Sequence, residues 1–225
     1  MTDLTGTSLA VRLAFGDEPP AAVLGYDERV VTHESLLADA ALADLIALRD
    51  APPGPRFVDR FRDRAHGGFH QVIERNGVVS MAGRHRRLGS QALAYLAAIT
   101  RADASGDVES AVRSREEFTT LLAAAVNAKL ATTYLPGMER PIDRQRRLTD
   151  VAWAFIAAHD AGLKAASNLG DAIFEFFDDE KGVFWEVLEP TGEPDLLEGH
   201  YLAGNALALL ALHRMDRAGV AVDHE

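Results

Sequence analysis

Cysteine is absent from the 225-residue chain. This excludes disulfide bonds and metal sites built on thiolates. The stretch from Met1 to Thr7 lacks both the basic start and the apolar run of a secretory signal. No apolar stretch reaches the roughly 20 residues that a membrane-crossing helix needs. We therefore expect a cytoplasmic protein that does not bind membranes.

Sequence signatures of several well-known sites are also missing. The chain contains no Walker phosphate loop, dinucleotide fingerprint, nucleophile elbow or His-Glu-x-x-His pair. Its 8 histidines do not follow the spacing of a metal site. We expect neither a metal nor a cofactor.

Lysine is scarce, with 3 lysines against 20 arginines and 19 aspartates, and the net charge is −11. An acidic chain of this kind is not a general nucleic-acid binder. The composition fits either a GC-rich genome or the acidic, solvated surface of a halophile, and both interpretations stay open. The charge is uneven: residues 67–147 carry 12 basic and 8 acidic groups, whereas residues 148–225 carry 4 and 15.

One pattern occurs twice in the sequence, a short β-hairpin followed by an apolar helix. The hairpins are expected at 69–81, around Asn76-Gly77, and at 181–194. Asn-Gly favours a hairpin because a type I′ turn needs two positive φ angles. Phe69 and Phe184 are 115 positions apart, and Gln91 and Asn205 are 114 apart. This near-constant separation indicates an internal repeat.

Apolar periodicity predicts seven main helices, which alternate between two kinds. Those with apolar residues around most of their surface are expected inside, and those with one apolar stripe outside. The predicted ranges are 32–51, 56–64, 84–101, 107–133, 144–164, 167–178 and 200–215. We predict an all-α fold, a partial α/α toroid with two small β-hairpins. An irregular helical bundle is the alternative.

The domain organisation follows from the same pattern. Residues 1–31 contain several glycines and prolines and are expected to form an irregular lead-in. Residues 32–225 are expected to form a single domain. It consists of two repeats, at about 32–103 and 145–216, joined by a long helix.

Three runs resemble a known family: 147–157 (RLTDVAWAFIA), 176–184 (FFDDEKGVF) and 204–212 (GNALALLAL). They are similar to the helical C-terminal region of the spermatogenesis-associated thioredoxin-like proteins. That region is a six-hairpin α/α toroid, related to N-acylglucosamine 2-epimerases and six-hairpin glycosidases. Gly67-Gly-Phe69 with Gln91 also resembles the hairpin-then-helix unit of the epimerase group. The chain departs from the family in lacking the thioredoxin-like domain and its Cys-x-x-Cys pair.

The resemblance to epimerases directs attention to three candidate catalytic residues. Asp150 stands where epimerase-like enzymes carry a histidine, and the run from Glu198 to His200 resembles their second histidine motif. A carboxylate and an imidazole on opposite sides of a sugar could exchange a proton with it. The alternatives are that Asp150 caps its own helix and that His200 binds a loop carbonyl.

Candidate ligand-binding residues lie near the starts of the inner helices. Arginine forks match carboxylates and phosphates, and the positive end of a helix adds to their potential. Gln91 and Asn205 occupy equivalent repeat positions in apolar helices, so each amide needs a partner, either a neighbouring part of the chain or a ligand. The set is Arg86, Arg87, Arg147, Gln91, Asn205 and Trp185.

Two hypotheses about function follow. The first is a helical-repeat protein without catalysis, related to the thioredoxin-like family. The second is a carbohydrate-active enzyme, of the sugar epimerase, isomerase or glycosidase type, that binds a small anionic or carbohydrate ligand. In either case the last helix has apolar residues on several sides and no outer partner after it. We therefore expect a homodimer.

Overall fold

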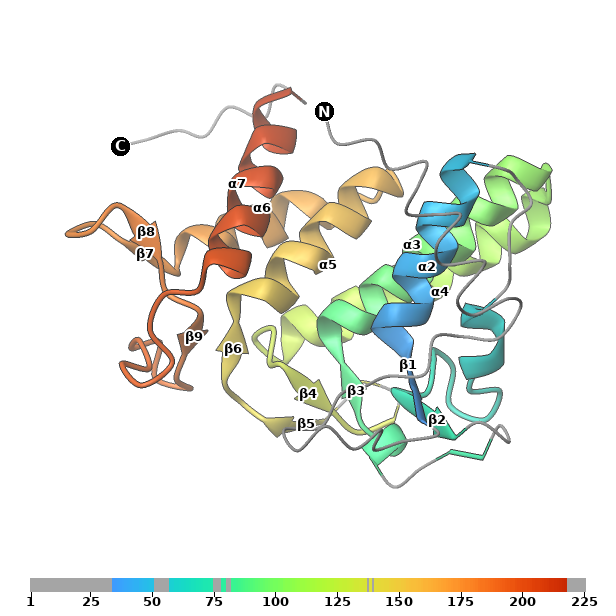
Figure 1. The fold of residues 1–225 in the computed structure, drawn as a ribbon, viewed down its shortest axis with the longest axis horizontal. Helices are drawn as coiled ribbons and strands as arrows, with labels where there is room; N and C mark the ends of the chain where they lie inside the picture. Colours follow the sequence, from blue (N-terminus) through green and yellow to red (C-terminus); the bar gives the residue numbers. More distant parts are fainter. Residues whose placement is uncertain are drawn as a thin grey trace, which may run out of the picture.

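The computed structural model describes residues 34–50, 57–74, 78–79, 82–136, 138 and 140–217, so the expected lead-in at 1–31 lies outside the described residues. The described part is mainly helical (Figure 1). Its α-helices are α2 (Leu37–Asp50), α3 (Leu88–Ser105), α4 (Val108–Asn127), α5 (Leu148–Asp160), α6 (Ala166–Phe174) and α7 (Leu202–Arg217). No helix among these ranges is both long and apolar enough to cross a membrane.

The helices form an inner row and an outer row. In the inner row α3 packs between α2 and α5, and α5 packs in turn against α7. The outer helices α4 and α6 pack on α3 and α5 respectively. This alternation of inner and outer helices is the one that the apolar patterns predict.

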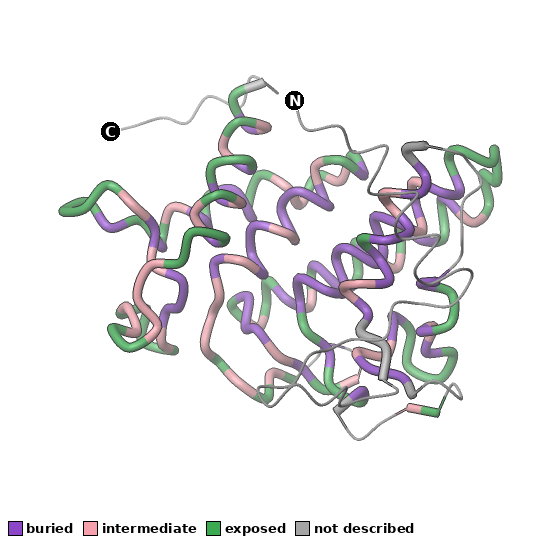
Figure 2. Tube along the Cα trace, in the orientation of Figure 1, coloured by how far each residue is buried: buried purple, intermediate pink, exposed green. Residues whose placement is uncertain are grey.

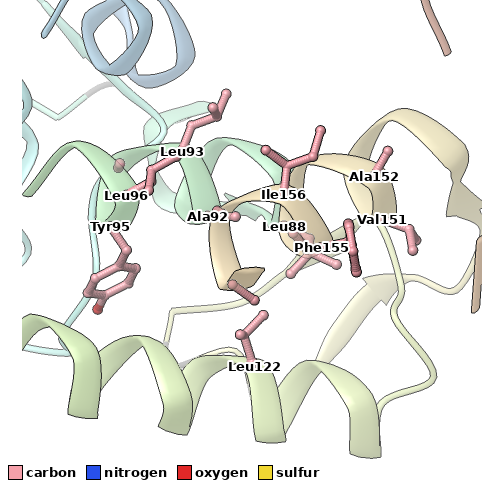
Figure 3. Close-up of a cluster of buried hydrophobic side chains, with 14 of the residues drawn as sticks. Leu88, Ala92, Leu93, Tyr95, Leu96, Leu122, Val151, Ala152, Phe155 and Ile156 are labelled. Atoms are coloured by element: carbon pink, nitrogen blue, oxygen red, sulfur yellow. The ribbon is translucent and has the colours of Figure 1, made fainter. Parts of the chain in front are cut away.

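The core lies between α3, α4 and α5. Leu88 and Ala92 of α3 lie near Leu122 of α4 and Phe155 and Ile156 of α5, while Tyr95 points to α4 (Figure 3). All six side chains are buried. The Tyr95 ring also stacks on Phe118, with 5.3 Å between ring centroids, and meets Phe69 edge-on at 5.0 Å. Residue Phe69 is thereby packed into the same core as the inner helices.

Short strands connect the helices. Two pairs and a three-stranded sheet form at the ends of the inner helices: β1 (Glu34–Leu36) with β2 (Val72–Glu74), β6 (Arg146–Arg147) with β9 (Val187–Leu188), and β3 (Arg86–Arg87) with β4 (Thr133–Tyr134) and β5 (Pro141–Asp143). A further hairpin joins β7 (Phe177–Asp178) to β8 (Val183–Phe184). All of these pairings are antiparallel.

Three inner helices start in the same way. A buried leucine begins each of α2, α3 and α5, directly after a short strand, and these starts lie at one end of the molecule (Figure 1). The backbone N–H of that leucine donates to a carbonyl group further along the chain, which satisfies one of the free donors at the helix start. The donors are Leu37, Leu88 and Leu148, and the acceptors are Gln71, Thr132 and Glu186, at 3.0, 3.1 and 2.9 Å.

Some predicted boundaries differ from the structure. The helix predicted at 56–64 is a single turn of 3₁₀ helix, Val58–Phe61. The helices predicted from 84 and 144 begin only at Leu88 and Leu148, because the arginine pairs before them form strands. Pairing with a neighbouring segment overrides the good helix propensity of arginine.

The predicted hairpins also differ in their pairing. Between the two arms of the first predicted hairpin, the described residues show a single bridge, Ile73 to Val79, while β2 pairs with β1. Phe69 itself bridges backwards to Arg62, as Phe184 pairs backwards with Phe177 in β7. In the second predicted hairpin, Leu188 bridges Pro194 around a turn closed by Gly192. Each hairpin phenylalanine therefore pairs with residues before it in the sequence.

Candidate functional site

The predicted site residues gather at the end where the inner helices begin. Arg87 lies in β3 and Arg147 in β6, Asp150 is in the first turn of α5, and Glu198 and His200 lie in the segment before α7. The structure joins the first four in two ion pairs, Arg87 with Asp150 and Arg147 with Glu198. We call this end of the molecule the rim.

Asp150 is held inside the protein. Only 3% of the residue is exposed, and both carboxylate oxygens accept from Arg87 Nε, at 3.0 and 3.1 Å. The N–H of Gly89 donates to the same carboxylate at 3.0 Å, so Asp150 caps the neighbouring helix α3 and not its own. Burial raises the pKa of Asp150, and the Arg87 guanidinium opposes this rise. These contacts differ from the open, central position that the sequence suggests for a base.

Arg147 and Glu198 are more accessible. Their side chains approach to 3.4 Å and are 30% and 35% exposed. A pair of this kind is weak because water screens it. Both groups therefore remain available to a ligand at the rim.

His200 forms a second, partly exposed cluster. Its Nε2 lies 3.1 Å from Asp178 Oδ2, and its ring stacks on Trp185 with 4.0 Å between centroids. Desolvation raises the pKa of Asp178, but hydrogen bonds from His200 and from the N–H of Lys181 outweigh it and hold the pKa below its usual range. An ionised carboxylate only accepts hydrogen bonds, so the Nε2–H of His200 donates, and in the neutral imidazole with this tautomer the lone pair is on Nδ1.

Asp178 does not figure among the sequence-predicted residues, although the repeat contains a signal for it. Asp63 precedes Asp178 by 115 positions, the separation of Phe69 from Phe184. Both aspartates accept backbone N–H groups of the turn that follows, those of Ala65 and His66 in one case and of Glu180 and Lys181 in the other. Each also contacts histidine. The shared spacing could have identified this pair from sequence.

Glu186 is a further residue that sequence reasoning missed. It is 4% exposed, and Oε1 accepts from the Thr149 hydroxyl, whereas Oε2 has no hydrogen-bond partner among the residues that the structure describes. A Cβ added to Gly204 of α7 would overlap Oε2. Burial raises the pKa of Glu186. The sequence around Glu186 gives no sign that its carboxylate is buried, because strand periodicity alone does not say which side of a short strand faces the interior.

The two amides on the predicted ligand-binding list bind backbone. Gln91 contacts Phe69, and Asn205 contacts Phe184, through both the N–H and the carbonyl group of the phenylalanine. Of the alternatives, a partner within the chain is therefore the one observed. The oxygen and the nitrogen of each side-chain amide are thus both bonded to backbone groups.

Arg86 and Trp185 differ in accessibility. Arg86 is 1% exposed and donates to Asp63 and, at 3.1 Å, to the carbonyl of Gly83. Its guanidinium is therefore committed to the interior. Trp185 is partly buried, with His200 against its ring and Lys181 Nζ 4.8 Å from the ring centroid. Arg86 nevertheless lines a cavity of about 280 Å³ together with Gln91, so these two predicted residues could contact a ligand there, whereas Trp185 could contact one beside His200.

Two cavities lie away from His200. One, of about 280 Å³, is lined by residues of the Asp63 turn, α3 and α4, among them Gly68, Tyr95 and Glu117. The other, of about 930 Å³, lies between the outer helices α4 and α6. Within the described ranges, no cluster of three histidine or carboxylate side chains is arranged to hold a metal ion.

Comparison with known proteins gives a fold but no family. No protein-family model and no curated protein matches the sequence. Among solved structures, a cellobiose 2-epimerase from Bacillus thermoamylovorans B4167 is similar with a TM-score of 0.59 at 10% identity, over 90% of this chain and 66% of the other. A D-mannose isomerase gives 0.57 at 16% identity, over 82% and 56%. A cellobiose 2-epimerase from Spirochaeta thermophila DSM 6192 gives 0.56 at 14%, over 85% and 59%.

These similarities establish the architecture. The chain spans about 56–66% of the lengths of the three structures it resembles. Such low identity carries the fold and not the reaction, because one fold hosts many activities. The predicted fold class, a partial α/α toroid of the six-hairpin type, is confirmed.

Proposed function

We propose that this protein acts on a sugar, as an epimerase or isomerase, with its site at the rim before α5 and α7. The observation that carries the proposal is the contact of partly exposed His200 with buried Asp178, together with the stacking of the His200 ring on Trp185. Aromatic rings beside a proton-transfer group suit a sugar, whose C–H faces pack on them. The similarity in fold to a cellobiose 2-epimerase and a D-mannose isomerase supports the same class.

His200 would act as the acid and base. In a sugar isomerase, a base removes the proton from the carbon next to the carbonyl group and returns it to the neighbouring carbon on the same face. In an epimerase with one such group, the deprotonated intermediate must turn over in the site before the same group returns the proton to the other face of that carbon. Asp178 accepts from Nε2–H and so orients the ring with the Nδ1 lone pair free for that proton. The negative charge that develops on the sugar oxygen would be stabilised by Arg147, which lies at the rim with Glu198.

The other rim groups would position these residues. We propose that Glu198 orients Arg147, and that buried Asp150 fixes Arg87 and the start of α3. Arg87 is 45% exposed in its side chain despite this pair, so one edge of its guanidinium can contact a ligand. Asp150 then contributes to the site through Arg87 and not as the base.

Deuterium exchange tests the proposal. The protein is incubated in D₂O with mannose, glucose, fructose or cellobiose, and deuterium at C1 and C2 is measured by mass spectrometry. His200→Asn should lower the exchange rate at least about a hundredfold, the usual contribution of a general base. His85→Asn is the matched control, because His85 is an exposed histidine of β3's lead-in. No exchange with any of these sugars, or equal rates for His200→Asn and the wild type, would refute the proposal.

A second candidate is a non-catalytic helical-repeat protein, and it is favoured by the surface of α7. Leu202, Leu209 and Leu210 are 87%, 62% and 41% exposed, and Figure 2 shows exposed stretches along α7. We propose that this surface forms a homodimer. The resemblance of 147–212 to the helical region of thioredoxin-like family proteins suits such a role. The division into repeats at about 32–103 and 145–216 is part of the same proposal, supported by the matching contacts of Gln91 and Asn205.

A further inference from the structure

The larger cavity, of about 930 Å³, is a groove on the outer side of the helical rows. Its walls are the end of α4, the segment that leads through β5 into β6, and α6 with the turn at 190–192. A volume in this range holds a small molecule. The lining residues that carry charge or hydrogen-bonding groups are Asn127, Lys129, Arg144, Arg146, Asn168 and Thr191, with Glu175.

Three cations from two segments line this groove, Lys129 after α4 and Arg144 and Arg146 in the stretch that leads into β6. Arg146 is fixed, since it pairs with Glu175, lies 5.7 Å from the Phe176 ring centroid and is only 14% exposed in its side chain. Within the part of the chain that the structure describes, neither Lys129 nor Arg144 has an ion-pair partner. The groove therefore has an excess of positive charge in a chain whose net charge is −11.

The backbone at Lys129 is held in an unusual conformation. Lys129 and Leu130 have φ angles of 59° and 54°, although neither is glycine. Two successive left-handed residues cost free energy and persist only where the surroundings impose them. Hydrogen bonds from their N–H groups to Val126 and Ala125, at 2.9 and 2.8 Å, close the end of α4. This turn fixes Lys129 in the wall of the groove.

Uncharged polar groups complete the lining. The amides of Asn127 and Asn168 and the Thr191 hydroxyl offer both donors and acceptors, while Ala124 and Ala172 leave an apolar floor between them. Neutral donors and acceptors next to cations match a ligand that has hydroxyl groups and one oxyanion. Arginine in particular binds phosphate and carboxylate through two parallel hydrogen bonds.

We propose that this groove binds a small polyhydroxylated anion, a sugar phosphate or a sugar acid. The groove is separate from the rim, although strand β6 contributes one residue to each, Arg146 to the groove and Arg147 to the rim. Arg146 contacts Glu175 on the groove side, whereas Arg147 contacts Glu198 at the rim, as neighbouring strand residues face opposite ways. The proposal therefore does not depend on a reaction at His200.

Calorimetric titration at low salt tests it, with glucose 6-phosphate, glucuronate, inorganic phosphate and glucose as probes. We expect glucose 6-phosphate or glucuronate to bind, and the tighter of the two identifies the oxyanion as phosphate or carboxylate. Arg144→Gln and Lys129→Gln should each weaken that binding about tenfold, the effect of losing one charge-assisted hydrogen bond. Arg84→Gln is the matched control, since Arg84 is an exposed arginine outside the groove, and should leave affinity unchanged.

Asn168→Leu separates recognition of the sugar from recognition of the anion. Asn168 is an exposed residue of α6, so this variant should fold, and it should weaken glucose 6-phosphate but not inorganic phosphate. The proposal is overturned if no anion binds, if glucose binds as tightly as the anions, or if Arg84→Gln weakens binding as much as Arg144→Gln. Equal affinities for inorganic phosphate and glucose 6-phosphate would overturn the part that concerns the hydroxyl groups. Exchange at His200 is measured separately, so failure of either proposal leaves the other intact.

Discussion

The side-chain amide of Gln91 binds both backbone groups of Phe69. Its Oε1 accepts from the Phe69 N–H at 3.0 Å, and its Nε2 donates to the Phe69 carbonyl at 2.8 Å. Asn205 makes the same two contacts with Phe184, at 2.8 and 2.9 Å. A single side chain thus joins α3 to the backbone of Phe69, and another joins α7 to the backbone of Phe184. The ring of each phenylalanine is buried beside its amide.

Replacing Gln91 with methionine should therefore destabilise the protein. Methionine has about the volume of glutamine but cannot bond to the Phe69 N–H and carbonyl. Gln91 is 0% exposed, so water cannot replace the lost partner. Each unsatisfied group costs about 1–3 kcal/mol, so we expect a loss of about 3 kcal/mol in the free energy of unfolding. Urea denaturation measures it. Asn205→Leu serves for comparison and should cost less, because Asn205 is only half-buried; equal or smaller losses at Gln91 would contradict this account.

Truncation of the two phenylalanines tests the packing next to these amides. Phe69 and Phe184 are 1% and 5% exposed. Changing either to alanine should cost about 3–5 kcal/mol, as in other filled aromatic sites. Tyr201→Ala is a suitable control, since Tyr201 is an aromatic residue that is 50% exposed. A loss below about 1 kcal/mol at either buried phenylalanine would show that its ring is not part of the core.

Gly204 and Glu186 should be coupled. A methyl group at Gly204 would overlap the Glu186 carboxylate, so Gly204→Ala should cost about 1–3 kcal/mol. In a Glu186→Ala background the overlap disappears, and the same change should cost less than about 0.5 kcal/mol or even stabilise α7 through helix propensity. The difference between the two measurements is the coupling. Equal costs in both backgrounds would mean that the carboxylate does not touch this face of α7.

Glu186 should also make stability depend on pH. Burial raises its pKa in the folded state, so the folded protein holds this proton more tightly than the unfolded chain. The stabilisation is then complete below the unfolded pKa of about 4.5 and is lost as pH rises through the higher folded value. Glu186→Gln should therefore be more stable than the wild type at pH 7, with the difference shrinking toward pH 4.5. Urea midpoints across this range test it, and Glu189→Gln, at a less buried carboxylate, is the control.

The surface of α7 gives a prediction about mass. A homodimer would have about twice the 24.3 kDa of one chain in light scattering. Leu202→Glu with Leu209→Glu should shift the protein to the mass of one chain without lowering helix content, because both side chains are exposed. Val108→Glu, on α4 and 72% exposed, should leave the dimer intact. A wild-type mass near one chain at micromolar concentration would refute the dimer.

Apolar periodicity predicted the fold well because it depends on local sequence. The alternation of inner and outer helices could be seen in patterns such as that around Trp153, and the separation of Phe69 from Phe184 marked two positions that the structure places alike. What could not be predicted depends on distant partners. The Arg86-Arg87 and Arg146-Arg147 pairs look helical in isolation and form strands only because β4 and β9 lie beside them.

For the candidate site, the sequence indicates where some residues lie along the chain but not what they contact. Arg147, Glu198 and His200 each lie next to the start of an inner helix, a position that can be predicted from apolar periodicity, while their role in a site stays a prediction. Asp150 was placed correctly in its helix, but its side chain points to α3, and no local pattern specifies the neighbour to which a helix-start carboxylate binds. Asp178 and Glu186 were missed for a related reason. Their surroundings, a histidine 22 positions away and a glycine of α7, come together only on folding.

The manner in which the inner helices begin has a consequence for the order of folding during synthesis. The first N–H of each helix donates to the carbonyl of a residue that is synthesised later: Gln71 for α2, Thr132 for α3 and Glu186 for α5. As the chain leaves the ribosome from its N-terminus, each helix is made before the carbonyl that closes its start. Helix α5 can therefore dock on α3 while its own start is still open, and it becomes fixed only when β9 emerges. In a nascent chain stalled between α6 and β9, the Leu148 N–H at the start of α5 would still lack its acceptor, the Glu186 carbonyl.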